Sequence, residues 1–278
     1  MYQELIRRAL EEDLGDGDHS SLACVPENAK GKATLYIKDD GVLAGVELAC
    51  EIFKFYDPDL QVDVFIQDGA RVKKGDVALE VRGAAQSILS TERLVLNFMQ
   101  RMSGIATQTR ELVDLTEGSK TQILDTRKTT PGLRLIEKWA VRIGGAMNHR
   151  MGLYDMIMLK DNHIDFAGGI AQAIERTRNY LKENSRDLKI EIEVRNEEEL
   201  KEVLEIGGVD RIMLDNFSPE RISKALEYIP ESYEVEASGG ITRETLKSYA
   251  ATGVDFISIG ALTHSFQSLD MSLKADFS

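Results

Sequence analysis

The sequence predicts an α/β protein, with a smaller α/β domain followed by a β/α barrel. Two observations predict this fold class. From about residue 121, short apolar runs typical of buried strands alternate with patterns typical of amphipathic helices. The first 110 residues differ, with glycine-bearing hairpins followed by one long helix. A chain of 278 residues is long enough for a barrel and a smaller companion domain.

The first domain is expected to span residues 1–110. Residues 1–15 have the spacing of an amphipathic helix, residues 64–83 indicate β-hairpins with Gly turns, and residues 91–115 indicate a long helix. The barrel domain is expected to span residues 111–268. The tail, residues 269–278, is a candidate to pack on the first domain.

Six apolar runs are the expected barrel strands. They are QILDT, MIMLK, KIEIEV, RIMLD, YEVEAS and FISIG, and GVDRIML at 208–214 recurs as GVDFISI at 253–259. Helical patterns lie between them, such as residues 169–181, and the helix after Ser218 begins with a cap residue and a proline. This alternation predicts a parallel sheet. Six strands fit a closed or nearly closed barrel better than a Rossmann sheet, because no GxGxxG follows the first strand.

Each of the six runs ends in residues suited to catalysis or binding. In chain order these strand-end residues are Arg127 and Lys128, Lys160, Glu193, Asp215, Ser238 and Gly260. The active sites of β/α barrels lie at the carboxyl ends of the strands, so these side chains are expected to converge. A carrier or scaffold protein would not need six such strand ends in order. The sequence therefore favours an enzyme.

The charge distribution predicts a pocket for a small anion. The net charge is −13, which argues against nucleic acid as a partner. Residues 126–160 nevertheless contain seven Lys or Arg and two acids. Three of these cations, Arg134, Lys138 and Arg142, follow an i, i+4, i+8 stripe and are expected on a solvated helix face. The other four, Arg127, Lys128, Arg150 and Lys160, remain as candidate anion ligands.

Composition also indicates a cytoplasmic protein. No apolar run approaches membrane-spanning length, and the amphipathic N-terminal segment lacks the features of a secretory signal. Two cysteines, Cys24 and Cys50, are too few for a disulfide framework, and neither belongs to a metal-binding motif. We therefore expect a reduced compartment and no membrane partner.

Two glycine-bearing segments follow the last two strands, ASGGIT at 237–242 and IGALTHS at 259–265. Barrels often bind phosphate with loops in this position, where bare backbone N–H groups face the anion. Glu193 and Asp215 end neighbouring strands, and paired carboxylates suit Mg²⁺, a sugar hydroxyl pair or a developing cation. Ion pairs with Lys160 and Arg127 are an equally open interpretation of these two acids. A metal-bound phosphosugar beside a second, carboxylated anion would suit this set.

The chain resembles the quinolinate phosphoribosyltransferases, also called nicotinate-nucleotide pyrophosphorylases (carboxylating). The resemblance lies in LDTRKTTPGLRLIEKWAVRIGGAMNHRMGLYD, IMLKDNHI, EIEV, MLDN, EASGG and GVDFISIGALTHS, and it runs from EEDLGDGD near the start to the last strand. It implies an N-terminal α/β sandwich domain and an incomplete barrel of six to seven strands. It also implies a Mg²⁺-dependent homodimer whose active sites are shared between the subunits.

The resemblance implies a role for each matching residue. Quinolinate would be bound by Arg127, Arg150, Lys160 and His149, with Thr126 beside them and Arg93 reaching the partner's site. His149 is expected to donate in its protonated form, which the substrate dianion would favour. Phosphoribosyl pyrophosphate and its Mg²⁺ would be bound by Lys128, Glu193, Asp215, Ser238, Gly239, Gly240, Ile259, Gly260, Ala261 and His264. Glu193 and Asp215 would hold the metal, partly through substrate and water, and Lys128, Lys160, Glu193 and Asp215 would be catalytic.

The implied reaction joins quinolinate to 5-phosphoribosyl 1-pyrophosphate and yields nicotinate mononucleotide, carbon dioxide and pyrophosphate for NAD biosynthesis. Two alternatives stay open. One is a related enzyme that acts on nicotinate, and the other is a molybdenum-transport-associated homologue. The second departs from NHR and KDNH, which this chain keeps.

Overall fold

The computed structural model describes residues 2–276, which form two compact units. The first unit comprises residues up to Arg110, Leu135–Gly145 and the segment from Ser265 onward. The second comprises Glu111–Arg134 and Ala146–His264. The segment 135–145, expected in the barrel domain, thus groups with the N-terminal residues. Residues 277–278 of the expected tail lie outside the described residues.

The first unit contains a four-stranded antiparallel sheet in the order β12-β1-β5-β3. The strands are β1 (Lys30–Ile37), β3 (Gln61–Val64), β5 (Val77–Ala84) and β12 (Met271–Asp276), and a small pair joins β2 (Gly41–Val42) to β4 (Arg71–Val72). The helices are α1 (Gln3–Leu14), α2 (His19–Cys24), α3 (Val46–Tyr56), α5 (Arg134–Ile143) and most of α4 (Ala85–Leu115). The chain end joins this sheet because β12 pairs with β1 from Lys32↔Asp276 to Ile37↔Met271.

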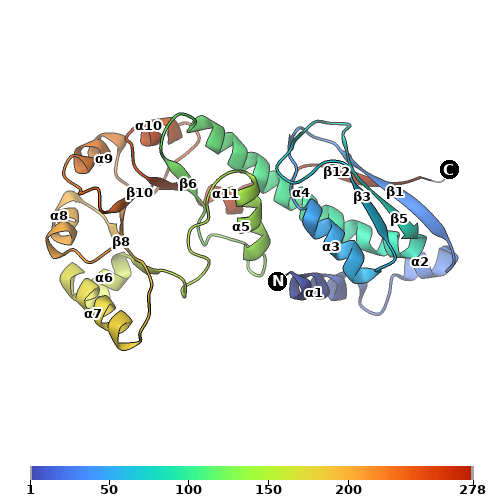
Figure 1. Cartoon of the computed structure of the whole chain (residues 1–278), viewed down its shortest axis with the longest axis horizontal. Helices are drawn as coiled ribbons and strands as arrows, with labels where there is room; N and C mark the ends of the chain where they lie inside the picture. The colour runs from blue at the N-terminus through green and yellow to red at the C-terminus, as the bar shows by residue number, and fades with distance from the viewer. Residues whose placement is uncertain (1, 277–278) are drawn as a thin grey trace. The chain divides into compact units, whose positions relative to one another are not determined.

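The second unit contains a six-stranded parallel sheet in the order β6-β11-β10-β9-β8-β7, as the six apolar runs predicted. The strands are β6 (Gln122–Leu124), β7 (Ile157–Leu159), β8 (Ile190–Val194), β9 (Arg211–Asp215), β10 (Glu234–Ser238) and β11 (Phe256–Ser258). The helices are α6 (Asp161–Ala167), α7 (Ile170–Glu183), α8 (Glu197–Ile206), α9 (Pro219–Leu226), α10 (Leu246–Ala250) and α11 (Ala261–His264). In Figure 1 the helices α7, α8 and α9 follow one another along the outside of the curved sheet.

The barrel is incomplete. Among the described residues β6 and β7 are the two edges of the sheet and do not pair with each other. Beyond the named strands, Leu124 at the end of β6 forms a parallel bridge to Met147. The open, six-stranded form confirms an incomplete barrel and excludes full closure by strand pairing.

Alternation along the strands separates two faces. In β8 the apolar residues Ile190, Ile192 and Val194 alternate with Glu191 and Glu193, and all five are buried. Side chains two residues apart in a strand lie on the same face. The sheet therefore presents one apolar face and one face that carries charged residues.

Two details of the helices differ from expectation. Helix α4 begins at Ala85, so Arg93 is its ninth residue and does not lie in the first turn. Lys138 of α5 is 1% exposed, which contradicts its place on the expected solvated stripe, whereas Arg142 is exposed as expected. Its neighbour Glu137 is also buried and forms an ion pair with Arg101. A short helix packed on several sides buries charged positions that its own periodicity would assign to solvent.

Candidate active site

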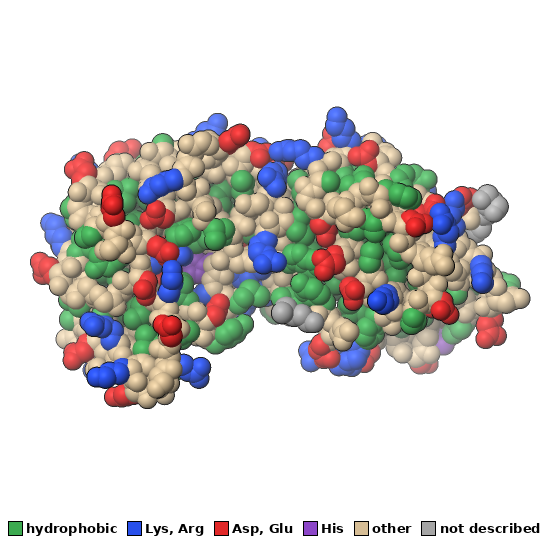
Figure 2. Space-filling model, in the orientation of Figure 1, with side chains coloured by type: hydrophobic (Ala, Val, Ile, Leu, Met, Phe, Trp, Pro, Cys, Tyr) green, Lys and Arg blue, Asp and Glu red, His purple; other side chains and the backbone are tan. Residues whose placement is uncertain are grey.

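A pocket of about 730 Å³ opens at the carboxyl ends of the strands in the second unit. Its volume lies in the range of small-molecule sites. All the predicted site residues except Arg93 line it: Thr126, Arg127, Lys128, His149, Arg150, Lys160, Glu193, Asp215, Ser238, Gly239, Gly240, Ile259, Gly260, Ala261 and His264. Figure 2 shows acidic and basic side chains interspersed over this unit, with histidine atoms visible between them.

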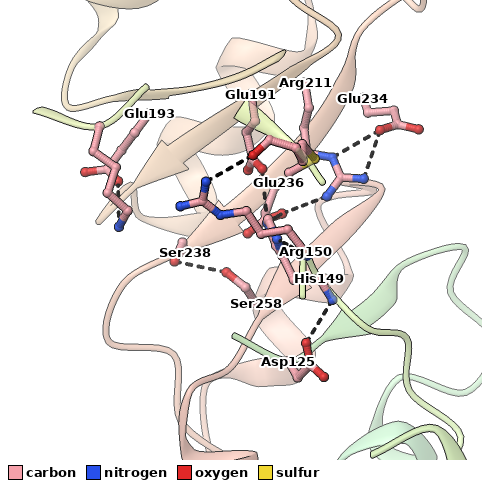
Figure 3. Close-up of polar contacts among 12 residues, drawn as sticks. Asp125, His149, Arg150, Glu191, Glu193, Arg211, Glu234, Glu236, Ser238 and Ser258 are labelled. Carbon is pink, nitrogen blue, oxygen red and sulfur yellow. Dashed lines mark hydrogen bonds and ion pairs between the residues drawn. The ribbon is translucent and has the colours of Figure 1, made fainter. Parts of the chain in front are cut away.

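The cations of the pocket come from two loops that one buried aspartate joins. Asp125 is fully buried at the end of β6, directly before the loop that carries Arg127. Its Oδ1 accepts a hydrogen bond from the His149 amide at 2.8 Å, and its Oδ2 accepts one from Asn148 Nδ2 at 2.6 Å. The carboxylate thereby fixes the loop of residues 148–150 beside the loop that follows β6 (Figure 3).

Arg127 and Arg150 are close enough to repel each other. Burial, and then the charge of Arg127, lower the pKa of Arg150. The Arg150 guanidinium donates to the Met156 carbonyl at 3.1 Å, which holds it within the pocket lining. A partly buried guanidinium with a second, exposed one nearby favours the binding of an anion.

His149 is directed at protein groups through both ring nitrogens. Its Nε2 lies 3.0 Å from Glu191 Oε2 and 3.4 Å from Glu236 Oε2, and both carboxylates are fully buried (Figure 3). Its Nδ1 accepts a hydrogen bond from the Arg150 amide at 2.7 Å. The negative charge beside His149 that was expected from a substrate dianion is therefore present in the protein itself, on Glu191 and Glu236.

Two influences on the proton of His149 oppose each other. Burial lowers its pKa, but the two glutamates outweigh burial and raise the pKa to about 9. The Arg150 amide, in contrast, requires a lone pair on Nδ1, so a second ring proton would break that hydrogen bond. The hydrogen bond determines the state of Nδ1, because two N–H groups cannot face each other at 2.7 Å. The ring is then neutral, with its proton on Nε2.

Glu193 is the last residue but one of β8 and Asp215 is the last residue of β9, and both line the pocket. Burial raises the pKa of both carboxyl groups. Lys160 Nζ lies 3.5 Å from Glu193 Oε2, as one of the two open interpretations predicted. Lys160 itself is positioned by His163, whose Nδ1 accepts from the Lys160 amide at 3.0 Å. Asn216 adds a donor to this group, with its Nδ2 2.6 Å from Asp215 Oδ2.

The glycine loops bring backbone close to neighbouring side chains. A Cβ added to Gly260 would lie 2.8 Å from Cδ of Lys128, so the lysine stem runs directly across this glycine. Gly239 has φ of +96°, and a Cβ there would lie 2.3 Å from Asn216 Oδ1. Between the two loops, Ser258 Oγ donates to Ser238 Oγ at 3.0 Å. This part of the pocket offers hydroxyl and amide donors without bulky side chains.

Comparison with known proteins identifies the family. Residues 18–103 match the N-terminal domain of quinolinate phosphoribosyl transferase, and residues 105–274 match its C-terminal domain. The chain belongs to the quinolinate phosphoribosyl transferase family. A chloroplastic nicotinate-nucleotide pyrophosphorylase (carboxylating) from Oryza sativa is 48% identical over 98% of this chain and 77% of its own. A probable enzyme of the same name from Bacillus subtilis is 43% identical over 99% of this chain and 94% of its own.

The fold of this quinolinate phosphoribosyl transferase family member matches solved structures. NadC from Streptococcus pyogenes has a TM-score of 0.93 and 39% identity, over 98% of this chain and 95% of that chain. The N-terminal α/β domain and the six-stranded parallel sheet that the resemblance implied are therefore both present.

Arg93 is the one predicted site residue outside the pocket lining. It lies on α4 in the first unit and is exposed, whereas Val95, Met99 and Met102 on the same helix are fully buried. The side chain of Arg93 therefore lies on the face of α4 that is opposite to the buried one. Its role in this quinolinate phosphoribosyl transferase family member stays a prediction.

Several residues near the pocket were missed by sequence reasoning. Asp125, Glu191, Arg211 and Glu236 support the cationic loops or lie beneath the pocket, and Met158, Met213, Asn216 and Ser258 are part of its lining. A signal for three of them was present. Glu191 precedes Glu193 by two residues, Arg211 precedes Asp215 by four and Glu236 precedes Ser238 by two, so strand alternation assigns each to the face of a predicted site residue.

Proposed function

We propose that this chain transfers the phosphoribosyl group of 5-phosphoribosyl 1-pyrophosphate to quinolinate, with loss of carbon dioxide and pyrophosphate, to form nicotinate mononucleotide for NAD biosynthesis. One observation carries the proposal most directly. The convergence of Arg127 and Arg150 in a half-buried pocket demands a small anion with more than one negative charge. A pyridine dicarboxylate meets that demand.

Quinolinate is bound by the cationic loops. The guanidinium groups of Arg127 and Arg150 are planar forks that match carboxylate geometry, and Lys160 adds a third positive charge. Thr126 and His149 complete this side of the pocket. Because the His149 nitrogens already face protein groups, its main contribution is to hold Arg150 in place, with the ring itself as a flat surface.

Phosphoribosyl pyrophosphate is bound by the carboxylates and the glycine loops. Lys128 crosses Gly260 and offers its ammonium group to the pyrophosphate, while the loops that carry Ser238 and Gly260 give donors to the phosphates. The other residues assigned to this substrate are Glu193, Asp215, Gly239, Gly240, Ile259, Ala261 and His264.

The residues present fit a magnesium ion. Glu193 and Asp215 provide hard carboxylate oxygens, and burial raises the pKa of each, which is a cost that a divalent cation would offset. When bound, Mg²⁺ neutralises charge on the pyrophosphate. The same two carboxylates stabilise the positive charge that develops on the ribose carbon as its bond to pyrophosphate breaks.

The reaction then needs no group beyond these. The pyridine nitrogen forms a bond to the anomeric carbon, and pyrophosphate leaves with the electrons of the broken C–O bond. The ring nitrogen becomes cationic, which stabilises the carbanion left when the adjacent carboxylate departs as carbon dioxide. A proton from solvent or from the pocket completes nicotinate mononucleotide. The pocket contributes by holding the two substrates in contact.

The active form is a cytoplasmic homodimer in which each site is completed by Arg93 of the partner. Arg93 is exposed, and its side chain makes no hydrogen bond or ion pair with the described residues. In the second unit Leu153, Tyr154 and Phe166 are between 71% and 89% exposed, an apolar surface that a partner would cover. Among residues 2–276, none of the helices combines the length and the apolar character needed to cross a bilayer.

The Arg150→Ala variant tests the assignment of the cationic loops. We expect quinolinate binding to weaken by ~1.5–3 kcal/mol, because one carboxylate loses a charge-assisted partner. Binding of phosphoribosyl pyrophosphate alone should change little. Isothermal titration calorimetry of each ligand measures both effects. Equal losses for the two ligands would refute the assignment.

A further inference from the structure

Beneath the pocket lies a buried group of four charged or titratable side chains: His149, Glu191 on β8, Arg211 on β9 and Glu236 on β10. His149 and Glu236 are part of the pocket lining, whereas Glu191 and Arg211 lie further from the carboxyl ends of their strands. Arg211 donates to Glu236 Oε2 at 3.2 Å. We call these four residues the histidine cluster (Figure 3).

The histidine cluster is costly to bury. Glu191 and Glu236 are both fully buried, and neither oxygen of Glu191 accepts a hydrogen bond of good geometry from the described residues. Burial, and then the charge of Glu236, raise the pKa of Glu191. Apolar side chains of similar volume often serve stability equally well in such positions. The two glutamates are therefore better explained by what they do to His149.

The two carboxylates determine which ring nitrogen of His149 carries the proton. Both lie within 3.4 Å of Nε2. Neither accepts the Nε2 proton in good hydrogen-bond geometry from the described residues, so it is their charge that favours a proton on this nitrogen. Nδ1 is then left with its lone pair, which accepts the Arg150 amide at 2.7 Å. That amide belongs to the residue whose guanidinium reaches the pocket and donates to the Met156 carbonyl. A continuous chain of contacts runs from the glutamates through the imidazole to Arg150.

We propose that Glu191 and Glu236 are positioning residues for quinolinate: they hold His149 as the Nε2–H tautomer, and His149 in turn holds Arg150. Neither glutamate needs to contact a substrate. The charges that face His149 come from Asp125 after β6, from Glu191 on β8, from Arg211 on β9, from Glu236 on β10 and from Arg150 beside it. This inference rests on the proposed function of the same pocket.

A bound cation is the rival explanation of the histidine cluster. The ligand atoms of His149, Glu191 and Glu236 lie within 4.8 Å of one another, a spacing that a metal ion could use. Arg211 argues against it, because its guanidinium already donates to Glu236 and would repel a second cation. Metal analysis of the purified protein decides between the two. One tightly bound metal per chain that is lost in Glu191→Gln would overturn the proposal.

Direct observation of the tautomer tests the first step without any change to the glutamates. The chain has four histidines, so ¹⁵N-histidine labelling gives few signals, and His149→Gln identifies those of His149 by their loss. We expect an unprotonated Nδ1 and a protonated Nε2 at neutral pH. Protons on both nitrogens, or on Nδ1 alone, would overturn the proposal.

The variants Glu191→Gln and Glu236→Gln test the second step. Loss of a group that orients a metal-ligating histidine typically lowers affinity or activity 10–100-fold, and by analogy we expect the KM for quinolinate to rise by roughly tenfold in each variant. The KM for phosphoribosyl pyrophosphate should stay within about twofold, and the His149 nitrogen signals should shift. A purely structural role would lower thermal stability and both affinities together. Unchanged quinolinate KM and unchanged signals in both variants would contradict the proposal.

Glu234→Gln is the matched control. Glu234 lies on β10 two residues before Glu236 and also pairs with Arg211, but its other partner is Lys189 and not His149. It should leave the His149 signals and the quinolinate KM unchanged. The wild-type protein distinguishes failure of the proposed function from failure of the positioning role. If it does not turn over quinolinate, the proposed function is refuted, and the tautomer measurement stays valid. If the wild type turns over quinolinate and both glutamate variants keep its quinolinate KM and His149 signals, only the positioning role is refuted.

Discussion

At the scale of single residues, the pocket keeps charged groups in places that cost stability. Burial raises the pKa of Glu193 and of Asp215 and lowers the pKa of Arg150. Each shift means that the folded chain holds the charged form less readily than the unfolded chain does. Such costs are typical of active sites, where the substrates and metal provide the missing counter-charges.

The Asp215→Asn variant should separate the effect of this carboxylate on stability from its effect on catalysis. The shape is kept and the charge is lost, so we expect kcat to fall at least about tenfold, equivalent to ~1.4 kcal/mol in the barrier, with a smaller change in quinolinate affinity. Because the folded-state pKa of Asp215 is raised, its charge destabilises the fold above that pKa and costs nothing when both states are protonated. The variant should therefore melt higher than wild type at pH 8, and the gain should shrink as pH is lowered. Wild-type turnover at saturating Mg²⁺ would remove Asp215 from the mechanism.

The strand-end residues of the pocket could be predicted from the sequence, because each stands at the end of an apolar run and parallel strands bring such ends together. Others, such as His149 and His264, followed only from the family resemblance. The residues one layer deeper could not be found in this way. Asp125 precedes Arg127 and Lys128, whose charges drew attention to the substrate side of this segment. Only the structure shows that the Asp125 carboxylate joins two loops. Glu191 and Glu236 follow the strand alternation, but which nitrogen of His149 they face depends on the ring orientation, which the sequence does not determine.

At the scale of elements, the loops after the last two strands determine the shape of the phosphate side. Gly260 precedes α11 and lies against the stem of Lys128, and Thr263 of α11 donates to the Lys128 carbonyl at 2.9 Å. Periodicity in the sequence predicted the six strands of the parallel sheet. The same periodicity wrongly predicted solvent exposure for Lys138 on α5, which is buried.

Gly260→Ala should act on one substrate only. The new Cβ would lie 2.8 Å from Cδ of Lys128 and 3.2 Å from Nε2 of His264, so the flexible lysine must move while the fold is kept. We expect the KM for phosphoribosyl pyrophosphate to rise roughly tenfold, the loss of about one good charge-assisted contact, with the quinolinate KM unchanged. Gly31→Ala serves as the control, because its Cβ would make only an ordinary contact of 3.6 Å with Ala85. An equal rise in both KM values would show that the glycine supports the fold and not the lysine.

At the scale of the whole molecule, the proposed function assigns the exposed Arg93 to the site of a partner subunit. If it completes the neighbour's pocket, Arg93→Ala and Lys160→Ala should each be nearly inactive alone. When the two are mixed and exchange subunits at random, about half the dimers carry both chains and each has one intact site. The mixture should then recover roughly a quarter of wild-type activity, because a closed two-fold interface makes the sites equivalent. No recovery, with exchange verified by native mass spectrometry, would place Arg93 in its own subunit's site or outside catalysis.

The proposed activity of this pocket is to bind a pyridine dicarboxylate and to release one of its carboxylates as carbon dioxide. The most direct measurement is the ratio of carbon dioxide to pyrophosphate formed from quinolinate, phosphoribosyl pyrophosphate and Mg²⁺, with nicotinate in a parallel reaction. We predict one carbon dioxide for each pyrophosphate with quinolinate and no turnover with nicotinate. Release of pyrophosphate with nicotinate, or from quinolinate without carbon dioxide, would contradict the account.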